Sequence, residues 1–330
     1  MDAIQAYLLF LAKAVTVVVA GLVLASGLAG AAGAGRGNPR DRLVVRRLND
    51  RYRTFERTLK RHTARPWGWR ERLRALRRNE APTRAPGSQR PRIYVLRFTG
   101  DLRAAQVESL REEVTAVLTQ ARRDLDRVVL ILESGGGMIP HYGLAAAQVQ
   151  RLREAGVHIT VTVDRIAASG GYLMAAAGDH IVAAPFAVIG SIGVVAQLPN
   201  LHRWLKRRDV DMEVLTAGEH KRTLTLLGRN TPEGRAKLQE ELEEAHGLFK
   251  DFLARHRPGL DLDRVATGEY WYGEQALSLG LVDALDTSDG ILQGLAGEHD
   301  LYEVTWQRRQ RLGQRIGGGI GRILERIGLG

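Results

Sequence analysis

The sequence contains no cysteine. This absence excludes disulfide bonds, thiolate metal sites and a cysteine nucleophile, and it leaves the redox compartment open. Lysine is scarce: six of the 48 basic residues are lysine, and the rest are arginine. Because arginine does not lose its proton in proteins, only these few lysines could supply a neutral amine as a catalytic base. There is also no His-Glu-x-x-His motif and no cluster of His and Asp, so we expect neither a metal nor a cofactor.

Positive charge is unevenly distributed along the chain. The formal net charge is +11, yet residues 93–307 carry 22 Lys and Arg against 30 Asp and Glu. Residues 36–78 carry 16 basic against 4 acidic side chains, and the last 23 residues carry 6 against 1. A nucleic-acid enzyme would place its positive field on the functional domain, so we expect no nucleic-acid partner. The basic ends instead favour anionic lipid.

The N-terminal segment is strongly apolar. Ala14 to Gly35 is a run of 22 residues without a charge, and a bilayer core requires about 20. The alternative is a cleaved signal peptide with a small-residue site at Ala29-Gly30-Ala31 or Ala32-Gly33-Ala34. The early Asp2 and the length of the run disfavour that alternative. We therefore expect residues 1–35 to be the transmembrane anchor of a single-pass membrane protein.

A basic segment separates this anchor from the body. In residues 36–91, helical spacing predicts an amphipathic helix at the membrane surface, with a charged linker as the alternative. The apolar positions are Leu43, Val44, Leu48, Tyr52, Phe55 and Leu59. Three prolines within 79–91 mark the boundary of the body. Seven arginines within 36–55 favour the cytoplasmic face under the positive-inside rule.

The body alternates between strand and helix patterns. We expect strands at Ile93–Phe98, Val128–Leu132, His158–Val163, His180–Ala183 and Glu213–Leu215, and helices at Ala104–Arg123, His141–Arg153, Leu201–Arg208 and 232–256. This alternation predicts a layered α/β fold with a largely parallel sheet, here assigned to residues 92–295. Residues 296–330 would form a basic tail, on lipid or in solvent.

Two small-residue segments could carry chemistry. In Ala167-Ala-Ser-Gly-Gly-Tyr172, Ser169 lies in a turn before a helical run, where helix N–H groups favour negative charge. Ala167 replaces the first glycine of the G-x-S-x-G elbow, and Ser169 could simply be a helix cap. In Glu133-Ser-Gly-Gly-Gly-Met138, glycines after a buried strand leave N–H groups free for an oxyanion hole, a tight turn being the alternative. The Gly-Lys-Ser/Thr of a phosphate loop is absent.

A catalytic serine needs a base. The histidines have no distinctive context, whereas Lys221 lies in the polar, glycine-containing loop Ala217-Gly-Glu-His-Lys-Arg222. The other five lysines lie in the apolar run, the basic segment or charged helices. A lysine takes a proton only as a neutral amine, a form that burial favours.

At Ala167–Tyr172 the sequence resembles the serine peptidase family of signal peptide peptidase A and protease SohB. The similarity extends from about Ile93 to Ile291 and is strongest with the SohB branch. It is carried by Ile189-Gly-Ser-Ile-Gly-Val-Val-Ala-Gln197, His220-Lys-Arg-Thr-Leu-Thr-Leu-Leu-Gly228 and Ala266-Thr-Gly-Glu-Tyr-Trp-Tyr-Gly273.

The resemblance implies roles for five residues. Ser169 would be the nucleophile, Lys221 the general base, Ser191 the hydroxyl that orients the amine, and Gly137 and Gly170 the oxyanion donors. It also implies a fold like that of ClpP and the crotonases, built from stacked β-α-β units on a twisted sheet. One departure is Gly135, where the family usually has proline, and it would loosen the first loop.

The expected function is a membrane-anchored, ATP-independent serine endopeptidase, and the resemblance implies that its membrane is the bacterial inner membrane. Its partners would be signal-peptide-like or unfolded membrane-derived peptides, the lipid bilayer and further copies of the chain in a homo-oligomeric ring. Signal peptide peptidases of this family usually face outward from the cytoplasm, whereas the arginines within 36–55 favour the cytoplasmic face here. Two alternatives are a catalytically silent scaffold and a crotonase-like acyl-binding protein, neither of which would need a Ser–Lys dyad.

Overall fold

The computed structural model describes residues 41–63, 90–218, 221 and 223–308, together with the isolated positions 7, 9, 10 and 13. Apart from those four positions, the predicted anchor at 1–35 lies outside the described residues, as do most of the linker at 79–91 and residues 309–330 of the predicted tail. Among the residues that are described, no helix has the length and apolar composition needed to cross a membrane. Residues 43–306 form one compact unit, which contains almost all of the described secondary structure.

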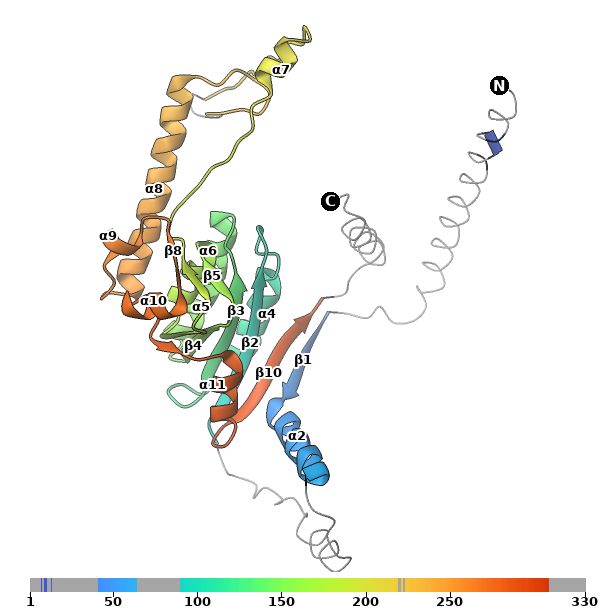
Figure 1. Ribbon diagram of the computed structural model, residues 1–330, viewed down its shortest axis with the longest axis vertical. Helices are drawn as coiled ribbons and strands as arrows, with labels where there is room; N and C mark the ends of the chain where they lie inside the picture. Colours follow the sequence, from blue (N-terminus) through green and yellow to red (C-terminus); the bar gives the residue numbers. More distant parts are fainter. Residues whose placement is uncertain are drawn as a thin grey trace, which may run out of the picture. The chain divides into compact units, whose positions relative to one another are not determined.

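A mixed sheet forms the centre of this unit (Figure 1). Its main path runs in the order β1-β10-β2-β3-β4-β6-β9, and the pairings of β10 with β2 and from β2 to β9 are parallel. The strands are β1 (Arg42–Arg47), β10 (Asp300–Gln307), β2 (Arg92–Gly100), β3 (Arg127–Ser134), β4 (His158–Val163), β6 (His180–Ala183) and β9 (Ala284–Leu285). The central strands are nearly continuous apolar runs because helices cover the sheet. The predicted α/β fold with a largely parallel sheet is confirmed.

The sheet divides at β3. Residues 127–131 of β3 pair with β4, whereas Ser134 pairs with Ala167 of β5 (Ile166–Ala168). From β5 a branch continues in parallel to β7 (Val188–Gly190), which pairs antiparallel with β8 (Tyr270–Tyr272). The carboxyl ends of β3, β5 and β7 therefore lie beside one another.

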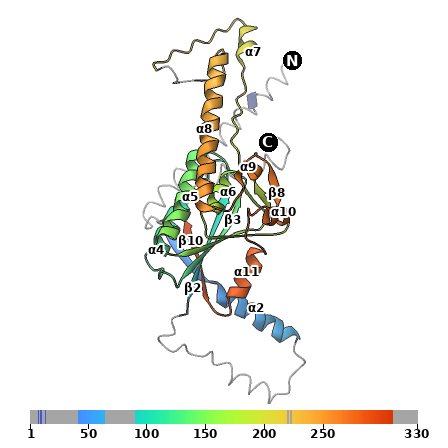
Figure 2. The same cartoon turned by 90° about the vertical axis from the view of Figure 1, so that its left-hand side faces the viewer.

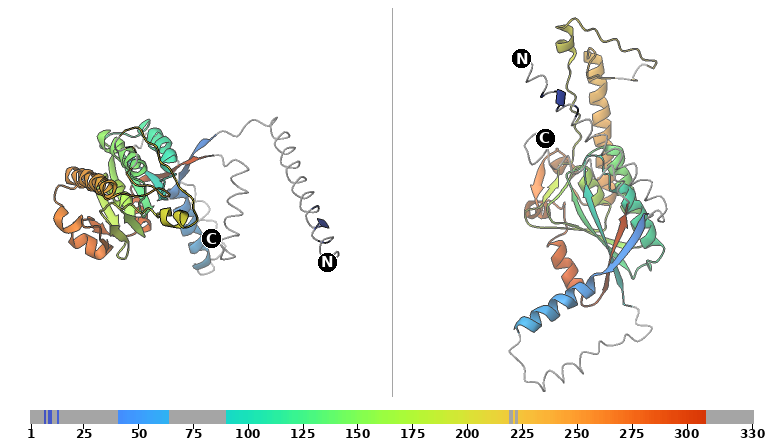
Figure 3. Two further views of the ribbon diagram at one scale, coloured as in Figure 1. Left: turned by 90° about the horizontal axis from the view of Figure 1, so that it is seen from above. Right: turned by 90° about the vertical axis from the view of Figure 1, so that its right-hand side faces the viewer.

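Helices cover both faces of the sheet (Figures 1 and 3). On one face, α4 (Val107–Leu118), α5 (Ile139–Glu154) and α6 (Gly170–Ala176) enclose the larger core. On the other, α2 (Leu48–Thr63) and α11 (Ser288–Leu295) pack on a smaller apolar cluster that includes Val95 and Ile131. Two short helices, α9 (Leu262–Val265) and α10 (Gly273–Ser278), adjoin the β7–β8 branch.

An arm formed by α7 (His202–Lys206) and α8 (Pro232–His256) extends from the sheet (Figure 2). The Thr231 hydroxyl caps α8 by accepting from the Gly234 N–H at 3.1 Å, as its Thr-Pro-Glu start predicts. Leu253 is fully buried in the main core, but no residue of the first two thirds of α8 is buried to that degree. The helix is therefore anchored by its C-terminal end.

Two predictions of local structure are wrong. Leu43 and Val44 belong to β1, and the helix starts only at Leu48. Here Asn49 stabilises the strand–helix junction: its amide donates to the Ala296 and His299 carbonyls and accepts from the Leu301 N–H. Residues Glu213–Leu215 form no strand, because they are exposed in the arm and no strand lies beside them among the described residues. The helix predicted at Ala104–Arg123 is shorter in the structure, where α4 spans Val107–Leu118. The predicted body ends too early at residue 295, because β10 of the sheet lies within the predicted tail.

Glu113 is an acidic side chain in an apolar setting between α4 and β10. It is 2% exposed; Oε1 accepts from the Trp306 N–H at 2.7 Å, and Oε2 has no hydrogen-bond partner. Burial raises the pKa of Glu113 from 4.5 to about 7, against the lowering effect of the Trp306 hydrogen bond. Glu113 therefore keeps its proton in the folded state at pH values where the unfolded chain has lost it.

We expect the free energy of unfolding to fall by roughly 3 kcal/mol between pH 4.5 and 7 because of Glu113. The sign follows because the folded state binds more protons in this window, so raising the pH favours the unfolded chain. Urea denaturation of the wild type and Glu113→Gln at pH 5 and pH 8 measures the effect. The variant should lose less stability across that range; equal losses would contradict the assignment.

Candidate active site

The predicted nucleophile, orienting serine and glycine loop meet at one edge of the sheet. In the parallel register, Ser134 lies opposite Ala167, and Ala168 lies opposite Gly190. The next residues after these strands are the loop Gly135–Gly137, Ser169 and Ser191. Because neighbouring strands lie about 4.8 Å apart, the three segments leave the sheet side by side. The structure therefore brings together four of the five predicted site residues: Ser169, Ser191, Gly137 and Gly170.

Ser169 lies on a sharp turn between β5 and α6. Its φ is 52° and its ψ is −121°, a conformation that non-glycine residues rarely adopt. Two backbone hydrogen bonds hold it: the Ser169 N–H donates to the Gly190 carbonyl at 2.7 Å, and its own carbonyl accepts from the Leu173 N–H at 3.0 Å. This strand–turn–helix geometry resembles that of a nucleophile elbow, although Ala167 stands at the position of the first glycine of that motif.

The glycine loop packs directly against this turn. Gly136 has a φ of +87°, and a Cβ on it would lie 2.7 Å from the Gly170 nitrogen and 2.8 Å from Ser169 Cβ. At Gly137 a Cβ would overlap the Leu102 carbonyl oxygen. A side chain at either position would therefore displace the loop, so glycine is required for a geometric reason.

Gly170 is the first residue of α6, where backbone N–H groups have no acceptor within the helix. A Cβ at Gly170 would lie 2.5 Å from Tyr142 Cγ. Gly170 directly follows Ser169, and Gly136 packs against the same turn, so the loop that contains Gly137 lies beside Ser169. Two buried residues behind this loop, Ser134 and Tyr142, have no predicted role in the sequence. No local pattern singles them out, because α5 brings Tyr142 to the loop.

Ser191 also has a left-handed backbone, with a φ of 50°. Its N–H donates to the Glu269 carbonyl at 2.7 Å, which ties the end of β7 to the residue before β8. Ser191 is partly exposed, and it follows Gly190 just as Ser169 follows Ala168, so the two serines are neighbours in the register. This position suits a hydroxyl that contacts an incoming amine.

Lys221 is not brought to Ser169 within one chain. Lys221 is exposed, and its backbone N–H donates to the Gly218 carbonyl at 3.3 Å. The surrounding loop is tied to the arm, because the Asn200 amide donates to the Thr225 and Gly228 carbonyls at 3.0 Å each. Figures 1 and 2 place α7 and the start of α8 at the end of the arm remote from the sheet. With 1.5 Å per residue, Pro232 lies about 32 Å from Leu253 along α8.

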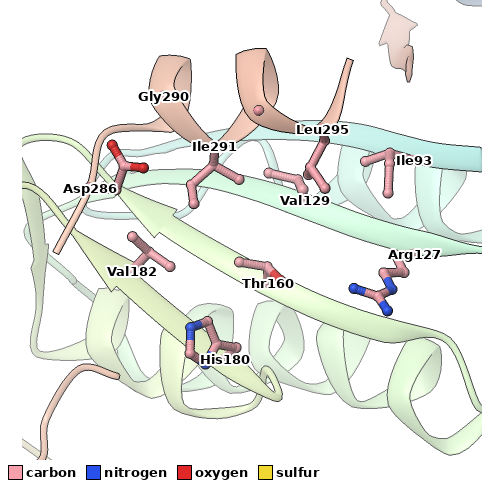
Figure 4. Close-up of a pocket in the computed structure, with 11 residues that line it drawn as sticks. Ile93, Arg127, Val129, Thr160, His180, Val182, Asp286, Gly290, Ile291 and Leu295 are labelled. Carbon is pink, nitrogen blue, oxygen red and sulfur yellow. The ribbon is translucent and has the colours of Figure 1, made fainter. Parts of the chain in front are cut away.

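A cavity of about 330 Å³ lies elsewhere, between α11 and the sheet (Figure 4). Its lining includes Arg127 and His180, the first residues of β3 and β6, so it lies near the opposite ends of the strands from Ser169. It is therefore separate from the candidate site. Within the described parts of the chain, no three His, Asp or Glu side chains gather in a way that could hold a metal ion.

Comparisons with known proteins identify the family of this chain. The family model described as Peptidase family S49 N-terminal matches residues 2–149, and that of Peptidase family S49 matches residues 151–301. The probable protease SohB of Haemophilus influenzae is 52% identical over 225 residues, 68% of this chain and 64% of that protein. The probable protease SohB of Buchnera aphidicola subsp. Acyrthosiphon pisum is 48% identical over 229 residues, 69% of this chain and 68% of that protein. The chain belongs to peptidase family S49.

Membership of S49 confirms the prediction of a serine peptidase family. The matched region spans 64% of the length of the Haemophilus influenzae relative. Among solved structures, a mutant of the membrane-bound stomatin-specific protease 1510-N aligns with a TM-score of 0.42 and 14% identity, over 62% of this chain and 84% of that chain. A ClpP1 mutant from Listeria monocytogenes aligns with a TM-score of 0.41 and 12% identity, over 60% and 94%. These alignments are too loose to assign the topology, which comes from the strand pairings above.

We expect Gly136→Ala to lower peptidase activity by about 100-fold or more, because the added Cβ displaces the loop from Ser169. Gly135→Ala is the matched control: a Cβ there would lie 3.8 Å from its nearest neighbour, Ile166 Cδ1, so activity should stay within about twofold. Casein hydrolysis by the two purified variants compares them. Equal activities would contradict the proposed fit between Gly136 and the Ser169 turn.

Proposed function

We propose that this S49 member is an ATP-independent serine endopeptidase in which Ser169 attacks the substrate carbonyl and Lys221 is the general base. The observation that supports the proposal most strongly is the strained Ser169 turn, enclosed by Gly136 and Gly170. A backbone that holds one hydroxyl at a strand-to-helix turn beside free N–H groups serves acyl transfer. A simple helix cap would not require this enclosure.

In the proposed reaction, the neutral Lys221 amine removes the Ser169 proton as Oγ bonds to the carbonyl carbon. The Gly137 and Gly170 N–H groups stabilise the resulting oxyanion, and Ser191 orients the amine. Collapse of the tetrahedral intermediate breaks the C–N bond, and the leaving amine takes the proton back from Lys221. Water then hydrolyses the acyl-enzyme by the same proton route, which restores Ser169.

We further propose that Lys221 acts on the Ser169 of a neighbouring copy in a closed homo-oligomer. Lys221 lies in the arm, remote from the Ser169 of its own chain. The arm also exposes many large apolar side chains, which in monomeric proteins are rarely gathered in one region. They include Val195, Leu198, Leu201, Trp204, Val210, Met212, Val214, Leu215 and Leu226. Burial of this surface against a second copy would bring a lysine to each serine.

The substrate class and the membrane anchor belong to the same proposal. The uncharged run at 14–35 and the basic flank that follows support a single-pass anchor, with the domain on the cytoplasmic face. A peptidase held at a bilayer encounters signal-peptide-like and unfolded membrane-derived peptides. Detergent extraction of the intact chain, with a reporter fused after Gly330, tests anchor and orientation together.

We expect Ser169→Ala to reduce casein hydrolysis by at least about a thousandfold without unfolding the protein. Ser278→Ala is the matched control, because Ser278 is an exposed serine on α10 whose hydroxyl bonds to the Gln275 carbonyl. It should keep wild-type activity. Wild-type hydrolysis by a folded Ser169→Ala protein would rule out this nucleophile and favour another centre or a silent scaffold.

Mixing inactive variants tests the shared dyad. When Ser169→Ala and Lys221→Ala are unfolded and refolded together at equal amounts, roughly a quarter of the sites should regain both groups. Each variant alone should remain inactive. Native mass spectrometry monitors the mixed oligomers. If these form and the mixture is as inactive as its parents, the dyad does not span two copies.

A further inference from the structure

Tyr142 of α5 lies behind the glycine loop and connects it to the rest of the fold. The side chain is fully buried. Its hydroxyl lies 2.5 Å from Ser134 Oγ and 2.7 Å from the Asp101 carbonyl oxygen. Ser134 Oγ in turn lies 3.0 Å from the Gly136 nitrogen. Four groups from three separate segments thus form one chain of hydrogen bonds.

The donor-to-acceptor direction of these hydrogen bonds follows from the groups at the two ends of the series. The Asp101 carbonyl oxygen can only accept, so the Tyr142 hydroxyl donates its single proton there. Tyr142 must then accept from Ser134, which leaves a Ser134 lone pair to accept from the Gly136 N–H. Every proton is used once and in one direction. Burial is the main cause that raises the pKa of Tyr142, so the phenol stays protonated as this direction requires.

These linked hydrogen bonds fix one side of the glycine loop, and a further backbone hydrogen bond fixes the other side. The Met138 N–H donates to the Leu102 carbonyl at 2.9 Å, next to the Asp101 carbonyl that accepts from Tyr142. The N–H groups of Gly136 and Met138 are therefore both engaged by neighbouring parts of the fold. The N–H between them belongs to Gly137, the predicted oxyanion donor, and its direction is set by these two attachments.

The ring of Tyr142 contacts the other predicted donor. A Cβ on Gly170 would lie 2.5 Å from Tyr142 Cγ, so the ring packs against the first residue of α6. Phe98 supports the ring on another side, with ring centroids 6.5 Å apart in an edge-to-face arrangement. One side chain thus contacts Gly170 through its ring and holds Gly136 through its hydroxyl and Ser134.

We propose that Tyr142 and Ser134 are positioning residues that set the oxyanion hole by holding the Gly135–Gly137 loop against the Ser169 turn. The proposal rests on the proposed peptidase function. A positioning role acts on the transition state, whose oxyanion needs correctly aimed N–H groups, and leaves ground-state binding of the peptide unchanged. The hydroxyls of Tyr142 and Ser134 should therefore affect kcat and leave KM unaltered.

The test compares Tyr142→Phe, Ser134→Ala and the double variant with the wild type, all as full-length protein in detergent. Tyr142→Phe keeps the ring and removes the hydroxyl. Tyr172→Phe is the matched control, because Tyr172 is equally buried and donates to the Leu281 carbonyl at 2.9 Å, outside the loop. The measurements are kcat and KM on a fluorogenic peptide that the wild type cleaves, the rate of fluorophosphonate labelling, and the melting temperature.

We expect each single variant to lose about 10- to 100-fold in kcat and in labelling rate, with KM within about twofold. The double variant should lose no more kcat than the single variant with the larger loss, because both hydroxyls act through the same series of hydrogen bonds. Tyr172→Phe should keep kcat within about twofold at a similar loss of melting temperature.

Three results would overturn the proposal: unchanged kcat in Tyr142→Phe, a multiplicative loss in the double variant, or an equal loss in Tyr172→Phe. In each of these cases the wild type is active, so the proposed function stands while the positioning role fails. A folded wild-type protein that hydrolyses neither casein nor any fluorogenic peptide and does not react with fluorophosphonate would instead refute the proposed function, and the positioning role with it.

Discussion

Two parallel pairings, of β3 with β5 and of β5 with β7, determine where the glycine loop, Ser169 and Ser191 leave the sheet. With Ser134 opposite Ala167 and Ala168 opposite Gly190, the three strands end at the same edge. A slip of one residue would turn each following side chain to the other face. The strained conformation of Ser169 depends on the same register, because its N–H donates to the carbonyl of Gly190.

Much of this site could be predicted from local sequence. Strands buried in a parallel sheet are rich in β-branched and apolar residues, so the sequence predicts the bounds of β4 and β6 to the residue, and the small residues of Ala167–Tyr172 indicate the turn. Tyr142 could not be found in this way, because its contacts with Ser134 and Asp101 arise only when α5 packs over the ends of β2 and β3. Leu43 and Val44 were misassigned because a short apolar run fits helix and strand alike, and pairing with β10 decided between them. The Glu213–Leu215 pattern favours a strand, yet a strand requires a neighbour, and the described residues of the arm contain none.

Ser169 lies at the edge of the sheet and Lys221 lies in the projecting arm, so one chain does not complete the proposed dyad. Four predicted residues come from the ends of paired strands, where neighbouring backbone fixes them. Lys221 comes from a long connection between β7 and α8, whose loop is held by Asn200 within the arm itself. A site divided in this way would be inactive in an isolated chain, and it would link peptide hydrolysis to assembly. The exposed apolar side chains of the arm give a physical reason for such assembly.

The central claim is that Ser169 is the nucleophile of this S49 member, and covalent mapping tests it most directly. The full-length protein is treated with a fluorophosphonate, digested with trypsin and analysed by mass spectrometry. Ser169 and Ser191 lie on the same tryptic peptide, 166–203, so fragment spectra must distinguish them. The account predicts a single adduct on Ser169 that appears as casein hydrolysis disappears. An adduct on Ser191 or on any other serine, or inhibition without modification of Ser169, would contradict it.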